Sequence, residues 1–190
     1  MNPILRISGW IDEGRLSADP EPDAMALATV GPDGRPSARI VYCRGLDARG
    51  IRFFTNYDSR KGRELEAHPE AAVVFFWASL GRQLRIEGPI EKLAAADSDA
   101  YFHARPRDNQ ISGFVSPQSQ PIASLDVLRA KSAEAVARFE GREVPRPAHW
   151  GGYLLRPRAV EFWTRGEARL HDRLRLELVD GTWKEERLAP

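Results

Sequence analysis

Between residues 25 and 93, short segments rich in β-forming residues follow one another with very short connections. Residues 31–34 (Gly-Pro-Asp-Gly) and residues 47–50 have the composition of tight turns. Parallel strands need a connection of about a dozen residues or more, so most of these segments are expected to pair as antiparallel strands. The expected strands are Met25–Val30, Ser37–Arg44, Ile51–Thr55, Ala71–Leu80 (with the composition of a strand buried on both faces) and Arg82–Leu93.

Helical patterns interrupt this series and follow it. Ser59 is expected to cap a short helix over residues 60–68, which Pro69 ends. A second helix is expected over residues 94–104, and a third over residues 125–139, where apolar residues recur at helical spacing. Three more strands are expected near the end of the chain, at Gly152–Leu155, Ala159–Thr164 and Leu170–Val179.

The order of these elements, β-rich then helical then β-rich, predicts a mainly β protein with packed helices. We expect a barrel-like, Greek-key-like antiparallel sheet. Neither a repeat nor a long linker divides the sequence, so residues 1–190 are expected to form one domain, with a short helical segment in residues 1–20. With 42% apolar and 29% charged residues, the composition is that of a globular protein.

Charge and hydropathy exclude several classes of partner. The chain has 28 Lys and Arg against 27 Asp and Glu, and a net charge of +1 gives no reason to expect nucleic acid or an anionic membrane. The longest apolar run has eight residues, whereas a membrane-spanning helix needs about 20. No signal peptide is recognisable, so a cytoplasmic location is expected. Cys43 is the only cysteine and the four histidines are scattered, so we expect no metal site.

The balanced total hides a basic segment. Residues 35–61 contain seven Lys and Arg but only two Asp and Glu, a local charge of +5. Arg60 and Lys61 fall in the first turn of the expected helix, where the helix dipole and unpaired N–H groups already favour an anion. The segment therefore either binds a phosphate group or carries ordinary solvated charge, and the residues alone leave both alternatives open.

Two further clusters are candidates for ligand binding. If the chain is extended from Arg169 to Arg173, strand alternation places Arg169, His171 and Arg173 on one face, where a negative or aromatic ligand would offset their repulsion. Tyr101 and Arg105 would share a helix face if the helix reaches Arg105. Their spacing fits either a surface cation–π pair or a substrate clamp.

Several motifs, taken together and in this order, carry a resemblance to a known family. They are FTNYDSRK (residues 54–61), YFHARPRD (101–108), WGG (150–152), EFW (161–163) and RLHDR (169–173). From about residue 21 to residue 190, the chain resembles the pyridoxamine 5′-phosphate oxidase family. The resemblance implies an FMN-binding split β-barrel that works as a homodimer, with FMN at the interface between the subunits.

The resemblance also implies roles for individual residues. The FMN phosphate would be bound by Arg39, Arg60 and Lys61. The rest of the flavin would contact Ile40, Val41, Tyr42, Cys43, Arg44, Phe54, Thr55 and Gln83, while the partner chain would supply Gln118, Ser119, Trp163 and Arg173. The substrate phosphate would be bound by Arg44, Tyr101, Arg105 and Asn109, and the catalytic residues at the substrate ring would be Arg169 and His171.

The activity implied by the resemblance is oxidation of pyridoxine or pyridoxamine 5′-phosphate to pyridoxal 5′-phosphate, with hydride transfer to FMN N5 and reoxidation by O2 to give H2O2. Arg44 stands where the family usually has Lys, Asn109 where it commonly has Ser, and Tyr42 where it usually has an aliphatic residue. The N-terminal segment, residues 1–18, is also shorter than the N-terminal arm that is usual in the family. Two alternatives stay open: a flavin oxidase of this scaffold with another substrate, as in phenazine biosynthesis, or a non-catalytic protein that binds FMN or pyridoxal phosphate.

Overall fold

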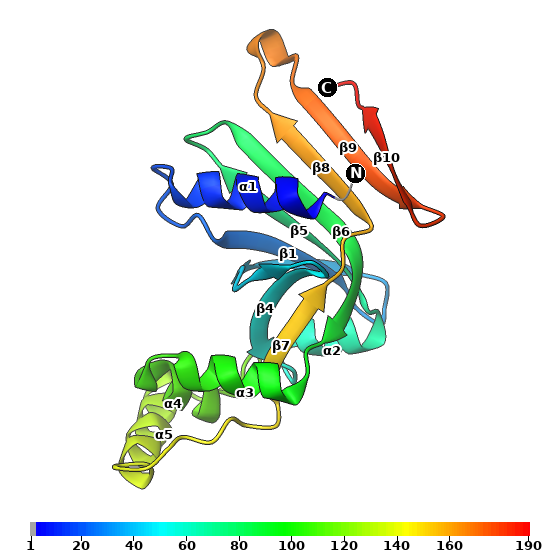
Figure 1. The fold of residues 1–190 in the computed structure, drawn as a ribbon. Coiled ribbons are helices and arrows are strands. Elements are labelled where there is room, and N and C mark those ends of the chain that lie inside the picture. Colours follow the sequence, from blue (N-terminus) through cyan, green and yellow to red (C-terminus); the bar gives the residue numbers. More distant parts are fainter. Residues whose placement is uncertain (1–2) are drawn as a thin grey trace.

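The computed structural model describes residues 3–190, which form a curled antiparallel sheet with one helix across it and three helices at one end (Figure 1). The helices are α1 (Ile4–Arg15), α2 (Arg60–Ala67), α3 (Ala95–Ala104), α4 (Arg107–Val115) and α5 (Leu125–Arg138). The strands are β1 (Ala24–Val30), β2 (Pro36–Tyr42), β3 (Leu46–Asp47), β4 (Gly50–Asn56), β5 (Glu70–Trp77), β6 (Arg82–Lys92), β7 (Trp150–Leu155), β8 (Ala159–Thr164), β9 (Asp172–Val179) and β10 (Thr182–Arg187).

Strand β6 joins the two parts of the sheet. Its first half pairs with β8 and its second half with β7, while β5 runs along most of its length. Between the two halves lies Gly88, where a Cβ atom would overlap the carbonyl oxygen of Arg156. The main strand order is β10-β9-β8-β6-β5-β1-β2, and β7 continues to β4 and β3. The change of partner along β6 bends the sheet into half a barrel, as the prediction of an antiparallel barrel requires.

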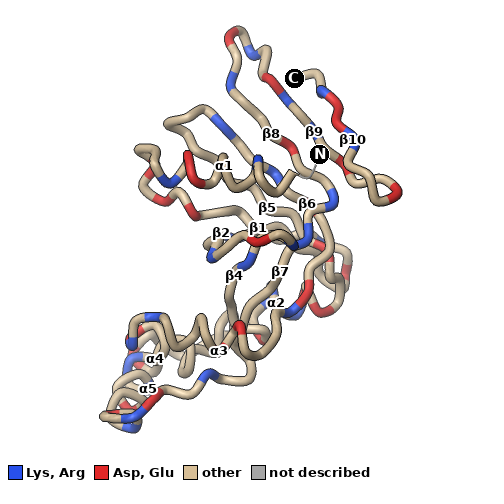
Figure 2. Tube along the Cα trace, viewed as in Figure 1, with Lys and Arg blue, Asp and Glu red and all other residues tan. Residues whose placement is uncertain are grey.

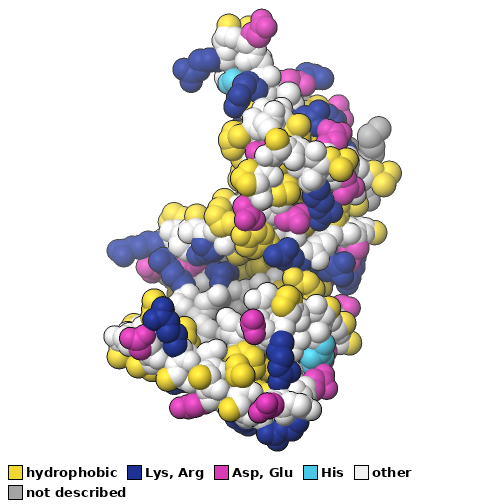
Figure 3. All heavy atoms as spheres, turned by 90° about the vertical axis from the view of Figure 1, so that its left-hand side faces the viewer, with side chains coloured by type: hydrophobic (Ala, Val, Ile, Leu, Met, Phe, Trp, Pro, Cys, Tyr) yellow, Lys and Arg dark blue, Asp and Glu magenta, His cyan; other side chains and the backbone are white. Residues whose placement is uncertain are grey.

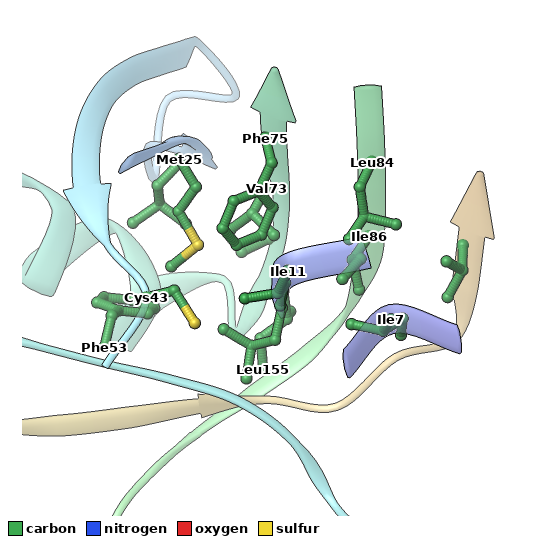
Figure 4. Close-up of a cluster of buried hydrophobic side chains, with 14 of the residues drawn as sticks. Ile7, Ile11, Met25, Cys43, Phe53, Val73, Phe75, Leu84, Ile86 and Leu155 are labelled. Carbon is green, nitrogen blue, oxygen red and sulfur yellow. The ribbon is translucent and has the colours of Figure 1, made fainter. Parts of the chain in front are cut away.

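The main hydrophobic core fills the inside of this curl. Ile7 and Ile11 of α1 are at most 2% exposed and lie among the side chains of β5 and β6, including Leu84 and Ile86 (Figure 4). Burial of each such aliphatic side chain contributes about 1.5–3 kcal/mol to stability. The helix at the start of the chain is therefore part of the core rather than an appendage.

A second, smaller core holds the three helices at the lower end of Figure 1 together. Phe102 of α3, Ile111 of α4 and Phe139 after α5 pack with Trp150, the first residue of β7. Helix α4 was not predicted, although the helix before it was correctly expected to end near Arg105. Its first residue follows Pro106, a residue type favoured at helix starts as well as after helix ends.

The structure corrects two further expectations from the sequence. Strand β5 ends at Trp77 and buries alternate residues only; Phe76 is 54% exposed, so the strand is not buried on both faces. The strand expected to start at Leu170 begins at Asp172 instead, and residues 167–169 form a short 3-10 turn. Strand β10 was not expected either, because its sequence TWKEER has no buried face.

Charges of both signs are spread along the whole trace (Figure 2), in keeping with the many ion pairs described below. Within residues 3–190, no helix combines the length and apolar character needed to cross a membrane. The same residues contain no group of three or more His, Cys, Asp or Glu able to hold a metal ion.

Candidate functional site

A cavity of about 540 Å³ lies between the β2–β4 part of the sheet and helices α3 and α4. In Figure 3 it is the hollow above the helical end of the molecule, with Lys and Arg side chains around it. Three of its lining residues are cationic and none is acidic. The lining includes Ile40, Val41, Tyr42, Arg44, Phe54, Thr55, Asn56, Lys61, Tyr101, Arg105, Asn109, Ser112, Ser116, Gln118 and Trp150. Such a cavity favours an anionic ligand.

The basic segment of residues 35–61 explains where this charge comes from. Five of its seven basic side chains form ion pairs with nearby carboxylates, namely Arg35, Arg39, Arg49, Arg52 and Arg60. The other two are Arg44 and Lys61, and both line the cavity. Among the described residues, the two basic side chains of this segment that pair with no carboxylate therefore both lie at the cavity.

Lys61 is held at the bottom of the cavity by the start of helix α2. Ser59 caps the helix by accepting a hydrogen bond from the N–H of Gly62, as predicted. The Lys61 Nζ donates to Thr55 Oγ1 at 2.8 Å, Ser59 Oγ at 3.0 Å and, at 2.8 Å, to the side-chain oxygen of Gln118. Burial, followed by the nearby Arg39 charge, lowers the pKa of Lys61 to about 8. A buried ammonium group with only neutral acceptors fits an anion such as a phosphate.

Arg39 and Arg60, the other residues expected at the FMN phosphate, do not line the cavity. Both pair with Glu64 of α2, whose side chain is 5% exposed, at 3.0 Å and 2.8 Å. Thr29 and Ser37 donate to the same carboxylate. Burial alone would raise the pKa of Glu64, but the four donors together lower it to about 2. Glu64 was not predicted as important, although its position four residues after Arg60 is the spacing of a helical ion pair.

Aromatic rings and Arg105 form the opposite wall of the cavity. Phe54 stacks on Tyr101 with ring centroids 3.8 Å apart, and Trp150 stacks beside Phe54 at 5.7 Å. The guanidinium of Arg105 lies 4.7 Å from the Trp150 centroid. Its Nη1 is buried and has no hydrogen-bond partner, and burial lowers the pKa of Arg105. Because α3 ends at Ala104, Arg105 reaches the cavity from extended backbone rather than from the helix face shared with Tyr101.

A second group of expected site residues forms a row across the outer part of the sheet. Gln83 of β6 pairs in register with Trp163 of β8, which pairs with Arg173 of β9. Arg173 is held by Glu161, which is 3% exposed, through Nε at 2.8 Å and Nη2 at 3.2 Å, and it also donates to the carbonyl of Ala189 at 3.0 Å. The guanidinium is thus fixed before any ligand binds.

His171 and Arg169 lie in the hairpin between β8 and β9. The backbone N–H of Gly166 donates to His171 Nδ1 at 3.2 Å, and the His171 ring lies 4.6 Å from that of Trp163. Ala168 and Arg169 both have positive φ, at 47° and 66°. The expected extended alternation from Arg169 to Arg173 is therefore wrong, because the chain is not a strand before Asp172.

These residues form two separate groups in one chain, which we call the cavity half and the sheet half. The cavity half comprises Arg44, Lys61, Tyr101, Arg105 and Asn109. The sheet half comprises Gln83, Trp163, Arg169, His171 and Arg173, none of which lines the cavity. Figure 1 shows the β8–β9 hairpin and helices α3 and α4 at opposite ends of the molecule. A single chain therefore does not bring the expected site together.

Four other expected residues lie in different parts of the chain. Gln118, expected from the partner chain, lies in the cavity of its own chain, where it also accepts from Thr55 Oγ1 at 3.0 Å. Ser119, next to it, is exposed, has φ of 67° and does not line the cavity. The Cys43 side chain is 1% exposed and points into the core, and Gln83 belongs to the sheet half.

Comparison with known proteins identifies the family. Residues 17–138 match a family model described as pyridoxamine 5′-phosphate oxidase, and residues 150–190 match one described as the pyridoxine 5′-phosphate oxidase C-terminal dimerisation region. The chain belongs to the pyridoxamine 5′-phosphate oxidase family. A curated member from Acidovorax sp. (strain JS42), named pyridoxine/pyridoxamine 5′-phosphate oxidase, is 52% identical over 100% of this chain and 87% of its own length. The name of this family member is that of an oxidoreductase.

Solved structures of relatives share the fold. PhzG from Burkholderia lata 383, solved in complex with tetrahydrophenazine-1-carboxylic acid, has a TM-score of 0.95 and 35% identity, covering 100% of this chain and 93% of its own. A pyridoxamine 5′-phosphate oxidase-related, FMN binding protein from Nostoc punctiforme has a TM-score of 0.79 and 18% identity, covering 100% and 98%. The split-barrel fold of the family, expected from the sequence motifs, is confirmed.

Proposed function

We propose that this chain is an FMN-dependent pyridoxine/pyridoxamine 5′-phosphate oxidase. The observation that carries the proposal is the cavity lined by Arg44, Lys61 and Arg105 with no carboxylate among its lining residues. Two phosphate groups, one on FMN and one on the substrate, would supply the negative charge that this cavity lacks. The name and 52% identity of the Acidovorax relative support the same activity.

In this proposal, Lys61 binds the FMN phosphate. Its ammonium group already has neutral hydrogen-bond acceptors, and a phosphate oxygen would add the counter-charge that stabilises it. Arg39 and Arg60 do not line the cavity. Both pair with Glu64 of α2, and from there they would add positive charge near the start of that helix. The helix N-terminus adds its own attraction for the anion. Ile40, Val41, Phe54 and Thr55 would line the flavin from the same chain.

Held by these residues, FMN would supply the hydride acceptor for oxidation of the substrate, with O2 as the final electron acceptor and H2O2 as the by-product. Arg44, Tyr101, Arg105 and Asn109 would fix the substrate phosphate, and the unpartnered Nη1 of Arg105 is a ready donor for it. Holding the phosphate in this way orients the substrate ring, which is a large part of what an enzyme contributes to such a transfer.

The sheet half of a second chain would complete the site in a homodimer. Gln83, Trp163 and Arg173 form a row across three strands, and Glu161 presets the Arg173 side chain for contact with the flavin. The match of residues 150–190 to a dimerisation region supports this arrangement. Arg169 and His171 would lie at the substrate ring. Because Gly166 donates to His171 Nδ1, the neutral ring carries its proton on Nε2, so His171 would act as a hydrogen-bond donor there.

The test is a direct assay of the purified protein. Its flavin band near 450 nm is recorded, and formation of pyridoxal 5′-phosphate from pyridoxine and pyridoxamine 5′-phosphates is followed in air. We expect a yellow protein that turns over at least one substrate, and loss of kcat/KM in Arg169→Ala and His171→Ala. A yellow protein inactive on both substrates would refute this substrate assignment, and failure to bind added FMN would refute the flavin assignment.

A second substrate class is favoured by one specific observation. The PhzG structure, with TM-score 0.95, contains an aromatic carboxylic acid, and the planar guanidinium of Arg44 suits a carboxylate as well as a phosphate. A flavin oxidase acting on a reduced aromatic carboxylic acid is therefore the alternative proposal. The same assay distinguishes it if tetrahydrophenazine-1-carboxylic acid is offered beside the two phosphate substrates.

A further inference from the structure

The end of strand β2 carries an aromatic–cation pair at the cavity. Tyr42, the last residue of β2, and Arg44, two residues later, are both exposed, whereas Cys43 between them is buried in the core. The guanidinium carbon of Arg44 lies 4.7 Å from the centroid of the Tyr42 ring. Both residues line the cavity, and the Tyr42 ring is 39% exposed.

No ion pair or side-chain hydrogen bond among residues 3–190 restrains the Arg44 side chain. It has neither an ion pair with a carboxylate nor a side-chain hydrogen bond, in contrast to Arg39 and Arg60, which Glu64 holds. A long exposed Arg side chain without partners samples many rotamers, and the ordering of that side chain opposes ligand binding. The contact with the face of the Tyr42 ring limits this freedom.

Across the cavity, Arg105 supplies a second guanidinium. Its Nη1 is buried without a hydrogen-bond partner. Burial lowers the pKa of Arg105, and the positive charge of Arg44 lowers it further, whereas Tyr101 raises it. Because both guanidinium groups line the same cavity, their like charges repel each other. A doubly charged oxyanion between them offsets this repulsion more fully than a singly charged one.

We propose that Tyr42 is a positioning residue: its ring holds the Arg44 guanidinium facing Arg105, so that the two side chains together bind one phosphate monoester dianion. This inference rests on the proposed function, because the dianion is taken to be the substrate phosphate. The proposed role of Tyr42 in specificity requires an arginine at position 44. A guanidinium stacks flat on an aromatic ring, whereas an ammonium group is a compact point charge.

A double-mutant cycle tests the proposal. Tyr42→Leu is expected to raise KM for pyridoxine 5′-phosphate about two- to fivefold, the factor equivalent to a cation–π contact of ~0.5–1 kcal/mol at an exposed site. Because Tyr42 is also among the residues expected at the flavin, KM is measured with saturating FMN, so that a change in FMN binding does not enter the comparison. Tyr42→Phe keeps the ring and is expected to behave as the wild type. In an Arg44→Met background, where the guanidinium is absent, Tyr42→Leu is expected to add nothing further.

Binding of product gives a readout that needs no turnover. The same cycle is measured as Kd values for pyridoxal 5′-phosphate and for pyridoxal, which lacks the phosphate. We expect Tyr42→Leu to weaken binding of the phosphate compound alone. If wild-type protein oxidises neither phosphate substrate, the proposed function fails, whereas these Kd values still decide the role of Tyr42.

Three outcomes would overturn the inference. The first is an unchanged KM and Kd in Tyr42→Leu. The second is an equal rise in KM and Kd when Tyr42→Leu is introduced into the Arg44→Met background, which would mean that Tyr42 acts without Arg44. The third is a Tyr42→Phe variant as impaired as Tyr42→Leu, which would assign the effect to the phenol hydroxyl rather than to the ring.

Discussion

Under the proposed function, the buried amine of Lys61 is expected to make FMN binding depend on pH. Its pKa of about 8, against 10.5 for an ordinary lysine, means that burial and the Arg39 charge penalise the ammonium form by about 3 kcal/mol. A phosphate beside Nζ would remove most of this penalty. In the complex, the pKa of Lys61 is therefore expected to return towards 10.5.

The sign of the effect follows from proton linkage. Below pH 8, Lys61 is charged in both the free and the FMN-bound protein, so the Kd for FMN is flat in pH near 7. Between pH 8 and 10.5, the free protein has lost the Lys61 proton and FMN binding must take it up again. Kd then rises, approaching tenfold per pH unit, and at pH 9.5 it is expected to be about 30-fold higher than at pH 7.

Flavin fluorescence quenching measures this directly, in titrations of apoprotein with FMN from pH 7 to 9.5. Lys61→Met is expected to bind FMN more weakly at pH 7 and to lose the rise in Kd above pH 8. Lys92→Met is the matched control, since Lys92 is a partly exposed lysine paired with Glu66 outside the cavity. Riboflavin, which lacks the phosphate, is expected to show no such rise with the wild-type protein.

Two results would contradict this reasoning. A Kd for FMN that is the same at pH 7 and pH 9.5 would mean that Lys61 does not carry the phosphate contact. An unchanged rise above pH 8 in Lys61→Met would assign the titration to another group.

Two further predictions concern stability and the cavity wall. Glu64→Gln should lower the free energy of unfolding at pH 7 by ~1–3 kcal/mol in denaturant titrations, because Arg39 and Arg60 lose their shared carboxylate. The control is Glu66→Gln at an exposed position, which should change the free energy of unfolding by less than about 0.5 kcal/mol. Since the pKa of Glu64 is lowered to about 2, this contribution should be present above pH 4.5 and be lost between pH 4.5 and 2; an equal acid response in Glu64→Gln would refute it. Gly152→Ala should lower kcat/KM roughly tenfold, because its Cβ would lie 2.7 Å from Phe54 Cε1 and displace the ring from the cavity wall; unchanged kcat/KM would count against that role.

Local signals made much of the fold predictable. Ser59 and Pro69 bound helix α2 as expected, and the turn of residues 31–34 joins β1 and β2. Helix α4 escaped prediction because a proline such as Pro106 is common both just after a helix and at the start of one, so it does not by itself indicate a new helix. Strand β10 escaped because it is an exposed edge strand with no buried face from which a pattern could arise.

The motifs brought the candidate site residues to attention, but their arrangement depends on tertiary contacts. The i,i+4 spacing indicates the pair of Arg60 and Glu64, but no spacing rule indicates that Arg39 of strand β2 shares this carboxylate from 25 residues away. Nor does the sequence of RLHDR reveal the positive φ of Arg169, which breaks the expected alternation. Separation of the site into two halves follows from the sheet order, which joins β8 and β9 to β6 rather than to β4.

The central claim is that the cavity half of one chain and the sheet half of another form one active site. Arg105→Met removes a cation from the cavity half, and Arg169→Met removes one from the sheet half, so each variant alone is expected to be strongly impaired. When the two variants, carrying different tags, are dissociated and reassociated in equal amounts, half of the dimers contain both chains and one of their two sites is intact. The account predicts recovery of about a quarter of wild-type activity in this mixture. Mixed dimers, isolated through both tags, that are no more active than the separate variants would contradict it.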